Sequence, residues 1–225
     1  IFSNCRLLIM INFSTNTNVT LGAFTHFIFG SWLKHSSATI NTTGTTINFN
    51  GLDPQTISSS NFNNIIFSQS GVKNIAGNIF VNGNLTIQAN ANLIGGTSDT
   101  IVIKGDWINS GTFTPSTSAV LFARKDTSTI SGTENTTINN LVISDSTVLK
   151  VVSGKKIILN GELTENGYLY GDIEKTERLF FAGFPYTFGN IGTEIAFVNI
   201  APDTTTVLRS VGIVADGFES DQAVK

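Results

Sequence analysis

The sequence predicts an all-β protein built mainly as a parallel β-helix, a solenoid in which each coil of chain stacks on the next. Three observations lead to this fold class: a stretch of sequence that occurs twice, an alternation of apolar and polar residues with a period of two, and frequent Gly and Asn-Gly pairs. No window offers a convincing helix of ten or more residues. We expect the solenoid to be right-handed, because crossovers between parallel strands nearly always are.

The repeated stretch is clearest at residues 139–144 (NNLVIS), which match residues 63–68 (NNIIFS). Trp32 and Trp107 begin the two copies, so the offset between the copies is 107 − 32 = 75. Internal repeats of this length indicate a repeat architecture, in which small insertions fall in loops. The repeat predicts equivalent inward positions for three pairs of residues: Phe49 with Phe122, Ile65 with Leu141, and Phe67 with Ile143.

Each part of residues 1–161 then has an expected structure. Residues 1–31 resemble a frayed copy with strands near 5–12, 19–21 and 24–29, residues 32–106 form the first clear copy, and residues 107–161 begin the second. Alternation, as in residues 46–50 and 84–88, predicts half-buried strands with Ile, Val, Leu and Phe inward.

Asn64 and Asn140 stand at matching places of the repeat. Stacked Asn side chains in adjacent coils can hydrogen-bond along a ladder. The simpler alternative is that Asn suits turns.

Residues 162–225 are expected to form a separate β element that covers the open end of the solenoid. The repeat fails after Leu163, and all three Tyr residues occur beyond it. Residues 1–160 contain nine Lys/Arg and six Asp/Glu, a balance of +3, whereas residues 161–225 contain four and ten, a balance of −6. An uncovered coil exposes apolar side chains and free strand edges. The side chains expected to cover it are Phe180, Phe181, Phe184 and Phe188.

Composition narrows the possible classes of function. Charged residues make up 13% of the chain, about half the usual share, which is typical of a turn-rich extracellular β protein. The single cysteine, Cys5, excludes an intrachain disulfide and a cysteine metal site. A net charge of −3 gives no general attraction to nucleic acid or an anionic membrane, and the apolar run 7–13 is too short to span one. Because the chain begins inside a repeat, we expect a fragment of a longer protein.

The order of motifs resembles one family. The motifs are Gly105-Asp106-Trp107, then Gly111 to Pro115 (GTFTP), then residues 119–122, 129–132 and 138–143. They are similar to the repeats of very large surface proteins of gliding bacteria that use type IX secretion, and residues 186–192 (YTFGNIG) resemble a segment that often follows such repeats. The resemblance covers most of residues 19–215. It implies parallel β-helices, export across both membranes, attachment at the cell surface and roles in adhesion or motility, and it supplies no catalytic residues.

Catalysis is the main alternative, since many β-helices cleave polysaccharides. Lys104, Asp106, Arg124 and Asp126 lie about one coil apart and could share a face, as acid–base groups must. Against this, Asp126 has a repeat partner in Asp53, which precedes Pro54 as in a turn. We therefore predict no catalytic residues.

Other binding chemistry has weaker support. His26 and His35 lack metal-ligand spacing, so we predict no metal and no cofactor. Trp32 and Trp107 could stack on sugars, but their place in the repeat favours core packing. Residues 42–46 (TTGTT) suggest an ice-binding solenoid only faintly, because the run is single.

The functional prediction is a secreted or cell-surface structural or adhesin segment of a larger protein, with no catalysis. Its expected partners are the secretion and surface-anchoring machinery and an extracellular ligand such as a surface polysaccharide. The first alternative is a carbohydrate-active β-helix enzyme, such as a polysaccharide lyase or hydrolase, and the second, with less support, is an ice-binding solenoid.

Overall fold

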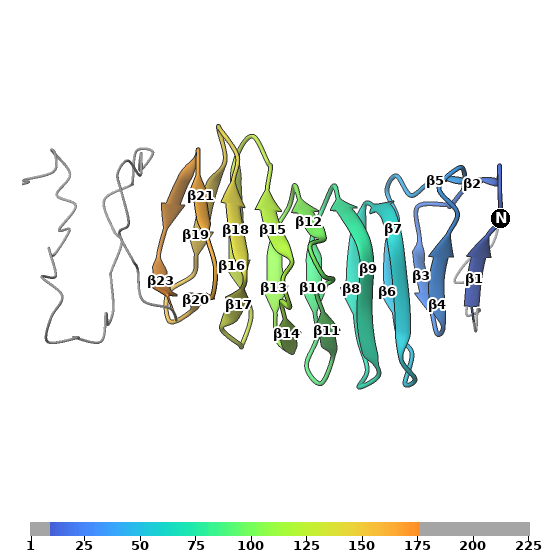
Figure 1. Ribbon diagram of the computed structural model, residues 1–225, viewed down its shortest axis with the longest axis horizontal. Coiled ribbons are helices and arrows are strands. Elements are labelled where there is room, and N and C mark those ends of the chain that lie inside the picture. The colour runs from blue at the N-terminus through green and yellow to red at the C-terminus, as the bar shows by residue number, and fades with distance from the viewer. Residues whose placement is uncertain (1–9, 176–225) are drawn as a thin grey trace, which may run out of the picture.

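The computed structural model describes residues 10–175, which form strands and turns and contain no helix. Every strand pair is parallel, and the coils stack along one axis as a β-solenoid of about eight turns (Figure 1). No hairpin-linked antiparallel sheet occurs across residues 45–160, so the predicted fold class is confirmed. The right-handed sense stays a prediction.

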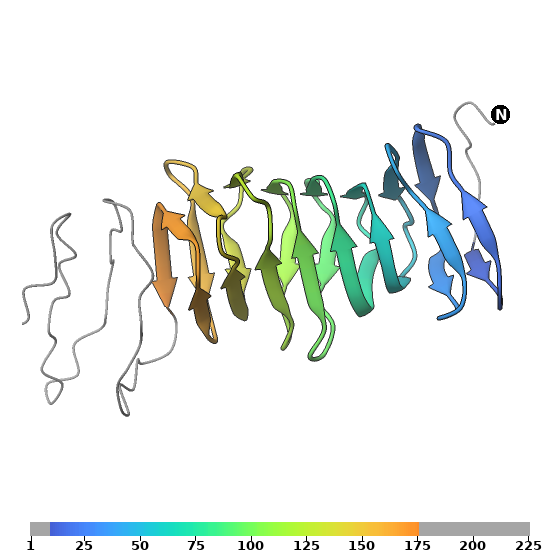
Figure 2. The ribbon, with the colours of Figure 1, turned by 90° about the horizontal axis from the view of Figure 1, so that it is seen from above.

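Two long sheets run the length of the stack, and two short sheets lie beside them (Figure 2). The 10-stranded sheet contains β1 (Met10–Phe13), β4 (Ser31–Lys34), β7 (Gln55–Phe62), β9 (Val72–Val81), β11 (Asn92–Ile94), β12 (Thr100–Ile103), β14 (Thr112–Thr114), β15 (Ala119–Phe122), β18 (Asn140–Ile143) and β21 (Leu163–Glu165). The 8-stranded sheet contains β3 (Thr25–Ile28), β6 (Thr46–Phe49), β8 (Asn64–Phe67), β10 (Leu85–Ile87), β13 (Trp107–Asn109), β16 (Thr127–Ser131), β19 (Val148–Val151) and β22 (Tyr168–Tyr170). The short sheets contain β17 (Thr136–Ile138), β20 (Lys156–Leu159) and β23 (Asp172–Lys175), and β2 (Asn18–Thr20) with β5 (Thr39–Asn41).

The core lies between the sheets and follows the period of two. In β8, Ile65 and Phe67 are fully buried whereas Asn64 and Ile66 face outward. Phe49 and Phe67 stack with ring centroids 5.8 Å apart, so aromatic contacts continue from coil to coil. Burial of such columns of apolar side chains stabilises each coil against its neighbours.

The sequence repeat does not follow the coil. The step along the chain from one coil to the next is 65 − 47 = 18 between the paired inward residues Ile47 and Ile65, and 130 − 107 = 23 between Trp107 and Ile130. The repeat offset of 107 − 32 = 75 is therefore close to three and a half coils, which moves a strand from one long sheet to the other. The inward side chains that we predicted are all fully buried: Phe49, Phe67, Ile65, Phe122, Leu141 and Ile143.

Their predicted equivalence is wrong in one respect. Phe49 lies in the 8-stranded sheet and Phe122 in the 10-stranded sheet. Both sheets place alternate side chains inward, so the period of two is the same in each, and the alternation cannot distinguish them.

The coils also continue past Gly161. β21, β22 and β23 pair in parallel with β18, β19 and β20, so residues 163–175 form one more coil and no separate element begins at residue 162. The expected cap, with Phe180, Phe181, Phe184 and Phe188, otherwise falls on residues 176–225, outside the described residues, as does Cys5.

Candidate functional site

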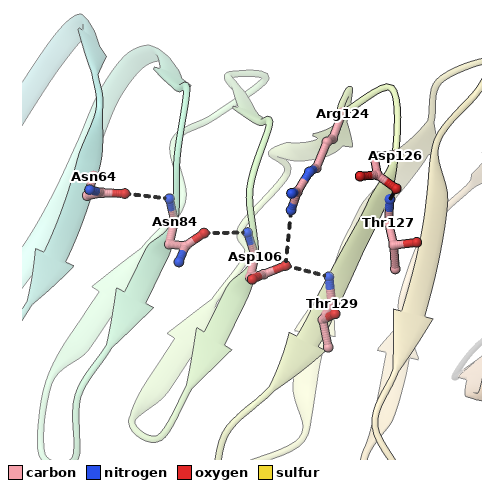
Figure 3. Close-up of polar contacts among 7 residues, drawn as sticks. All are labelled: Asn64, Asn84, Asp106, Arg124, Asp126, Thr127 and Thr129. Carbon is pink, nitrogen blue, oxygen red and sulfur yellow. Dashed lines mark hydrogen bonds and ion pairs between the residues drawn. The ribbon is translucent and has the colours of Figure 1, made fainter. Parts of the chain in front are cut away.

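The four residues considered for catalysis do not converge. Arg124 contacts Asp106 in a partly exposed ion pair, with 3.8 Å between guanidinium nitrogen and carboxylate oxygen. Lys104 is exposed, and the Asp126 carboxylate is exposed and accepts a hydrogen bond from the backbone N–H of Thr127 at 2.7 Å. Of the four, Arg124 and Asp106 form an ion pair, and Figure 3 shows the Asp126 carboxylate directed to Thr127 instead. A surface pair of this kind contributes little to stability.

Asp106 belongs to a ladder of polar side chains at the entry to the 8-stranded sheet, which we call the Asn ladder: Asn64, Asn84 and Asp106. Each side-chain oxygen accepts a hydrogen bond from the backbone N–H one coil further on: Asn64 from Asn84, Asn84 from Asp106, and Asp106 from Thr129, all at 2.9 Å (Figure 3). The ladder ties adjacent coils together at a corner. Asp106 thus occupies a structural position that Asn occupies in the two preceding coils.

The expectation that Asn64 and Asn140 stack in one ladder is wrong, although each of them bonds to the next coil. The amides bond to backbone rather than to one another, and Asn140 lies at the other long sheet. There its oxygen accepts from the N–H of Glu162 at 2.9 Å, as Asn64 does from Asn84. Gly83 and Gly161 lie against Asn64 and Asn140 so closely that a Cβ would clash with the side-chain oxygen. The repeated sequence thus builds the same corner on both sheets.

Both tryptophans belong to the core, as expected. Trp32 and Trp107 are fully buried, and the indole N–H of Trp32 donates to the Ser60 hydroxyl at 2.8 Å. Neither can offer a stacking surface to a sugar. In the threonine run, Thr42 and Thr45 are buried on either side of a turn, whereas Thr43 is exposed.

The histidines serve local turns. His26 Nε2 lies 3.0 Å from the carbonyl of Gly22, and His35 Nδ1 lies 2.9 Å from the Ser37 hydroxyl. Across the described part of the chain, no group of three or more His, Cys, Asp or Glu side chains could hold a metal ion. Among the same residues there is no helix with the length and hydropathy needed to cross a membrane.

Two titratable groups within residues 10–175 have shifted pKa values. Burial lowers the pKa of Lys73, which is fully enclosed, to about 8. Burial likewise raises the pKa of Glu165 to about 7, against an opposing hydrogen bond from the N–H of Leu169. Lys73 is fully buried, whereas Glu165 is half-buried with its Oε2 enclosed.

A shallow hollow of about 220 Å³ lies on the surface where the coil containing β5 meets the next two coils. Its lining is uncharged and, apart from Ile40, polar: Ile40, Asn41, Thr42, Thr43, Asn61, Asn63 and Asn82. We call it the amide hollow. Sequence analysis missed it because its residues come from three coils.

Phe80 is the neighbour, on the adjacent strand, of Asn61 in the lining of this hollow. It is the outward residue between inward Ile79 and Val81, it pairs in register with Asn61, and 41% of it is exposed. The sequence could have revealed Phe80, because an aromatic residue at an outward position of an alternating strand indicates an exposed ring.

Comparisons of the chain with protein families, with curated proteins and with solved structures find no match.

Proposed function

We propose that this chain is a segment of a secreted or cell-surface protein, with a structural or adhesive role and no catalytic activity. The observation that supports the proposal best is the architecture: parallel coils form an elongated stack whose ends lie far apart (Figure 1). Such solenoids offer extended surfaces for binding. Asn, Thr and Ser occupy many outward positions, apolar residues such as Ile66, Ile108 and Leu121 occupy others, and a low charge suits contact with neutral partners.

The resemblance to surface proteins of gliding bacteria supplies the rest of the proposal. It rests on the ordered motifs from Gly105 to Ile143, which in this structure build successive coils. On this basis the partners are a secretion and surface-anchoring machinery and an extracellular ligand.

Surface labelling of intact cells of the source organism tests this proposal. An antibody raised against residues 10–175 should label intact cells, and added protease should abolish that labelling. Labelling that appears only after lysis would contradict a surface location. Cytoplasmic control proteins should stay protected in the same experiment.

A carbohydrate-active enzyme is the second candidate, because Arg124 and Asp106 form a cation–carboxylate pair on an outer corner. Incubation with a panel of polysaccharides, followed by a reducing-end assay, distinguishes the two. Turnover that Asp106→Asn abolishes would favour the enzyme. If Asp106 serves only the Asn ladder, the unchanged chain should show no turnover. Asp106→Asn should still fold, since an Asn side chain keeps the acceptor oxygen for the N–H of Thr129.

A further inference from the structure

The amide hollow has the composition of a site for an uncharged, hydroxyl-rich ligand. No charged residue lines it, so it has no group that would select a phosphate, a carboxylate or a metal ion. Amides offer both donors and acceptors, and hydroxyl groups of a ligand can use both. The lining therefore matches a neutral polyol better than an ion.

Some side chains of this lining are held by hydrogen bonds within the protein, and others are not. The Thr42 hydroxyl donates to the carbonyl of Asn61 at 3.1 Å, and the Asn63 amide donates to the carbonyl of Thr45 at 3.3 Å. These bonds hold the base of the hollow in place. The side-chain amides of Asn61 and Asn82 are exposed and have no hydrogen-bond partner among residues 10–175. Fixed walls with free polar groups are typical of ligand sites that are formed before binding.

Phe80 supplies an apolar surface beside these amides. Asn61 is its register partner in β7, and Asn82 follows two positions later, just beyond the end of β9, so Phe80 neighbours both free amides. An exposed aromatic ring offers a flat face to the C–H groups of a sugar, while neighbouring amides bind the hydroxyls.

We propose that Phe80 and the amide hollow bind a neutral sugar unit of a polysaccharide, with Phe80 as the stacking platform and Asn61 and Asn82 as hydrogen-bonding groups. This inference deepens the proposed surface role and rests on it for its biological setting. Binding itself depends only on the described residues.

The test is affinity electrophoresis and calorimetry of the purified chain with soluble neutral polysaccharides, namely dextran, mannan and a galactan. We expect the chain to bind at least one of them. Phe80→Ala should weaken that binding by about tenfold, as the loss of one aromatic contact does. Asn61→Ala should weaken it by a similar factor, about fivefold to tenfold, through lost hydrogen bonds.

Two further variants separate sugar stacking from docking of a protein on an apolar patch. Phe80→Tyr keeps the ring and should keep the affinity, whereas Phe80→Leu keeps apolar area without a ring and should not. Tyr168→Ala is the matched control, since Tyr168 is 36% exposed and lies in the last coil. Its binding should equal that of the unchanged chain.

Several results would overturn the proposal. These are no binding to any of the three polysaccharides, unchanged binding by Phe80→Ala, or full affinity in Phe80→Leu. Because Phe80 faces outward, the melting temperature should not change in its variants, and lost binding then reports the site. A failure of sugar binding would not change the result of the surface-labelling experiment, so each proposal can be contradicted without the other.

Discussion

Lys73 lies inside the stack with its ammonium group surrounded by backbone carbonyls. Its Nζ donates to the carbonyls of Gly51, Gln69 and Gly71 at 3.1, 2.9 and 2.6 Å. Gln55, its register partner in the preceding coil, is also fully buried and accepts from the N–H of Gly51 at 2.9 Å. The two side chains together form hydrogen bonds with backbone N–H and C=O groups of a corner loop, which lies outside the strands and would otherwise leave these groups unpaired.

Replacing Lys73 by Met should therefore destabilise the fold. The variant keeps the apolar stem but leaves three carbonyls without their donor, and we expect a loss of roughly 2–4 kcal/mol in the free energy of unfolding. Denaturant unfolding followed by circular dichroism measures it. Lys104→Met, at an exposed position, is the control and should change stability by about 0.5 kcal/mol or less. Equal stability of both variants would show that the carbonyls find other donors.

Glu165 is an inward residue in the last described coil. It pairs with Ile143, which pairs with Phe122, so a carboxyl group continues an apolar column. Its Oε1 accepts from the N–H of Leu169 at 3.1 Å, while its Oε2 is buried without a hydrogen bond. Burial therefore favours the protonated form and raises the pKa to about 7 from its ordinary 4.5.

The stability of this coil should therefore decrease as the pH rises from 4.5 to 7. Within that window the unfolded chain releases the proton that the folded carboxyl keeps, so deprotonation favours unfolding. Hydrogen exchange of the amides of β21 and β22 should be faster at pH 8 than at pH 5, after correction for the intrinsic rates. Glu165→Gln should remove this dependence and is otherwise conservative. The same dependence in the Gln variant would assign it to another group.

At the scale of single elements, the corners define the register of the strands. The Asn ladder gives each of its three corner residues an acceptor for the next coil, and Asn140 does the same on the other sheet. Because strand alternation alone permits a slip by two residues, fixed corner contacts help to select one pairing.

Asn84→Ala should weaken the contact between β10 and β13. It removes the acceptor for the N–H of Asp106, and we expect a loss of about 0.5–1.5 kcal/mol, since the corner is exposed and water replaces part of the bond. Gln88→Ala, which changes an exposed residue at the other end of β10, is the control. Thermal unfolding compares the two, and a larger loss in Gln88→Ala would argue against the ladder.

Asp106→Asn separates the ladder from the ion pair. The variant keeps the acceptor oxygen but loses the charge facing Arg124 at 3.8 Å. Exposed ion pairs contribute about 1 kcal/mol or less, so stability should hardly change. A large loss would mean that the carboxylate has a role beyond the corner.

At the scale of the whole molecule, stability is a sum over coils and their contacts. Leu85 pairs with Trp107, so residues 85–106 make up one complete coil. β9 precedes this coil, and both β14 and β15 follow it in the same sheet. Removal of the coil leaves β8 facing β13, with each inward column intact.

Deletion of residues 85–106 should therefore give a shorter but folded solenoid, with a β-type circular dichroism spectrum and a cooperative unfolding transition. Deletion of residues 85–95 alone removes about half a coil and should prevent folding, because all later strands would then be shifted onto the opposite sheet. If both deletions unfold, the coils are not independent units. If both fold, the pairing in register is not required.

The sequence by itself determined the fold class and the inward residues. Alternation with a period of two and turns rich in Gly and Asn depend on nearest neighbours in the chain, so Trp32, Phe49 and Ile65 could be assigned to the core without coordinates. Tertiary structure decided which sheet each strand joins, where the coils continue past Gly161, and which side chains share a surface. Asn61 and Asn82 lie beside residues 40–43 only because of the number of residues in each coil. That number varies from coil to coil and cannot be read from the local sequence.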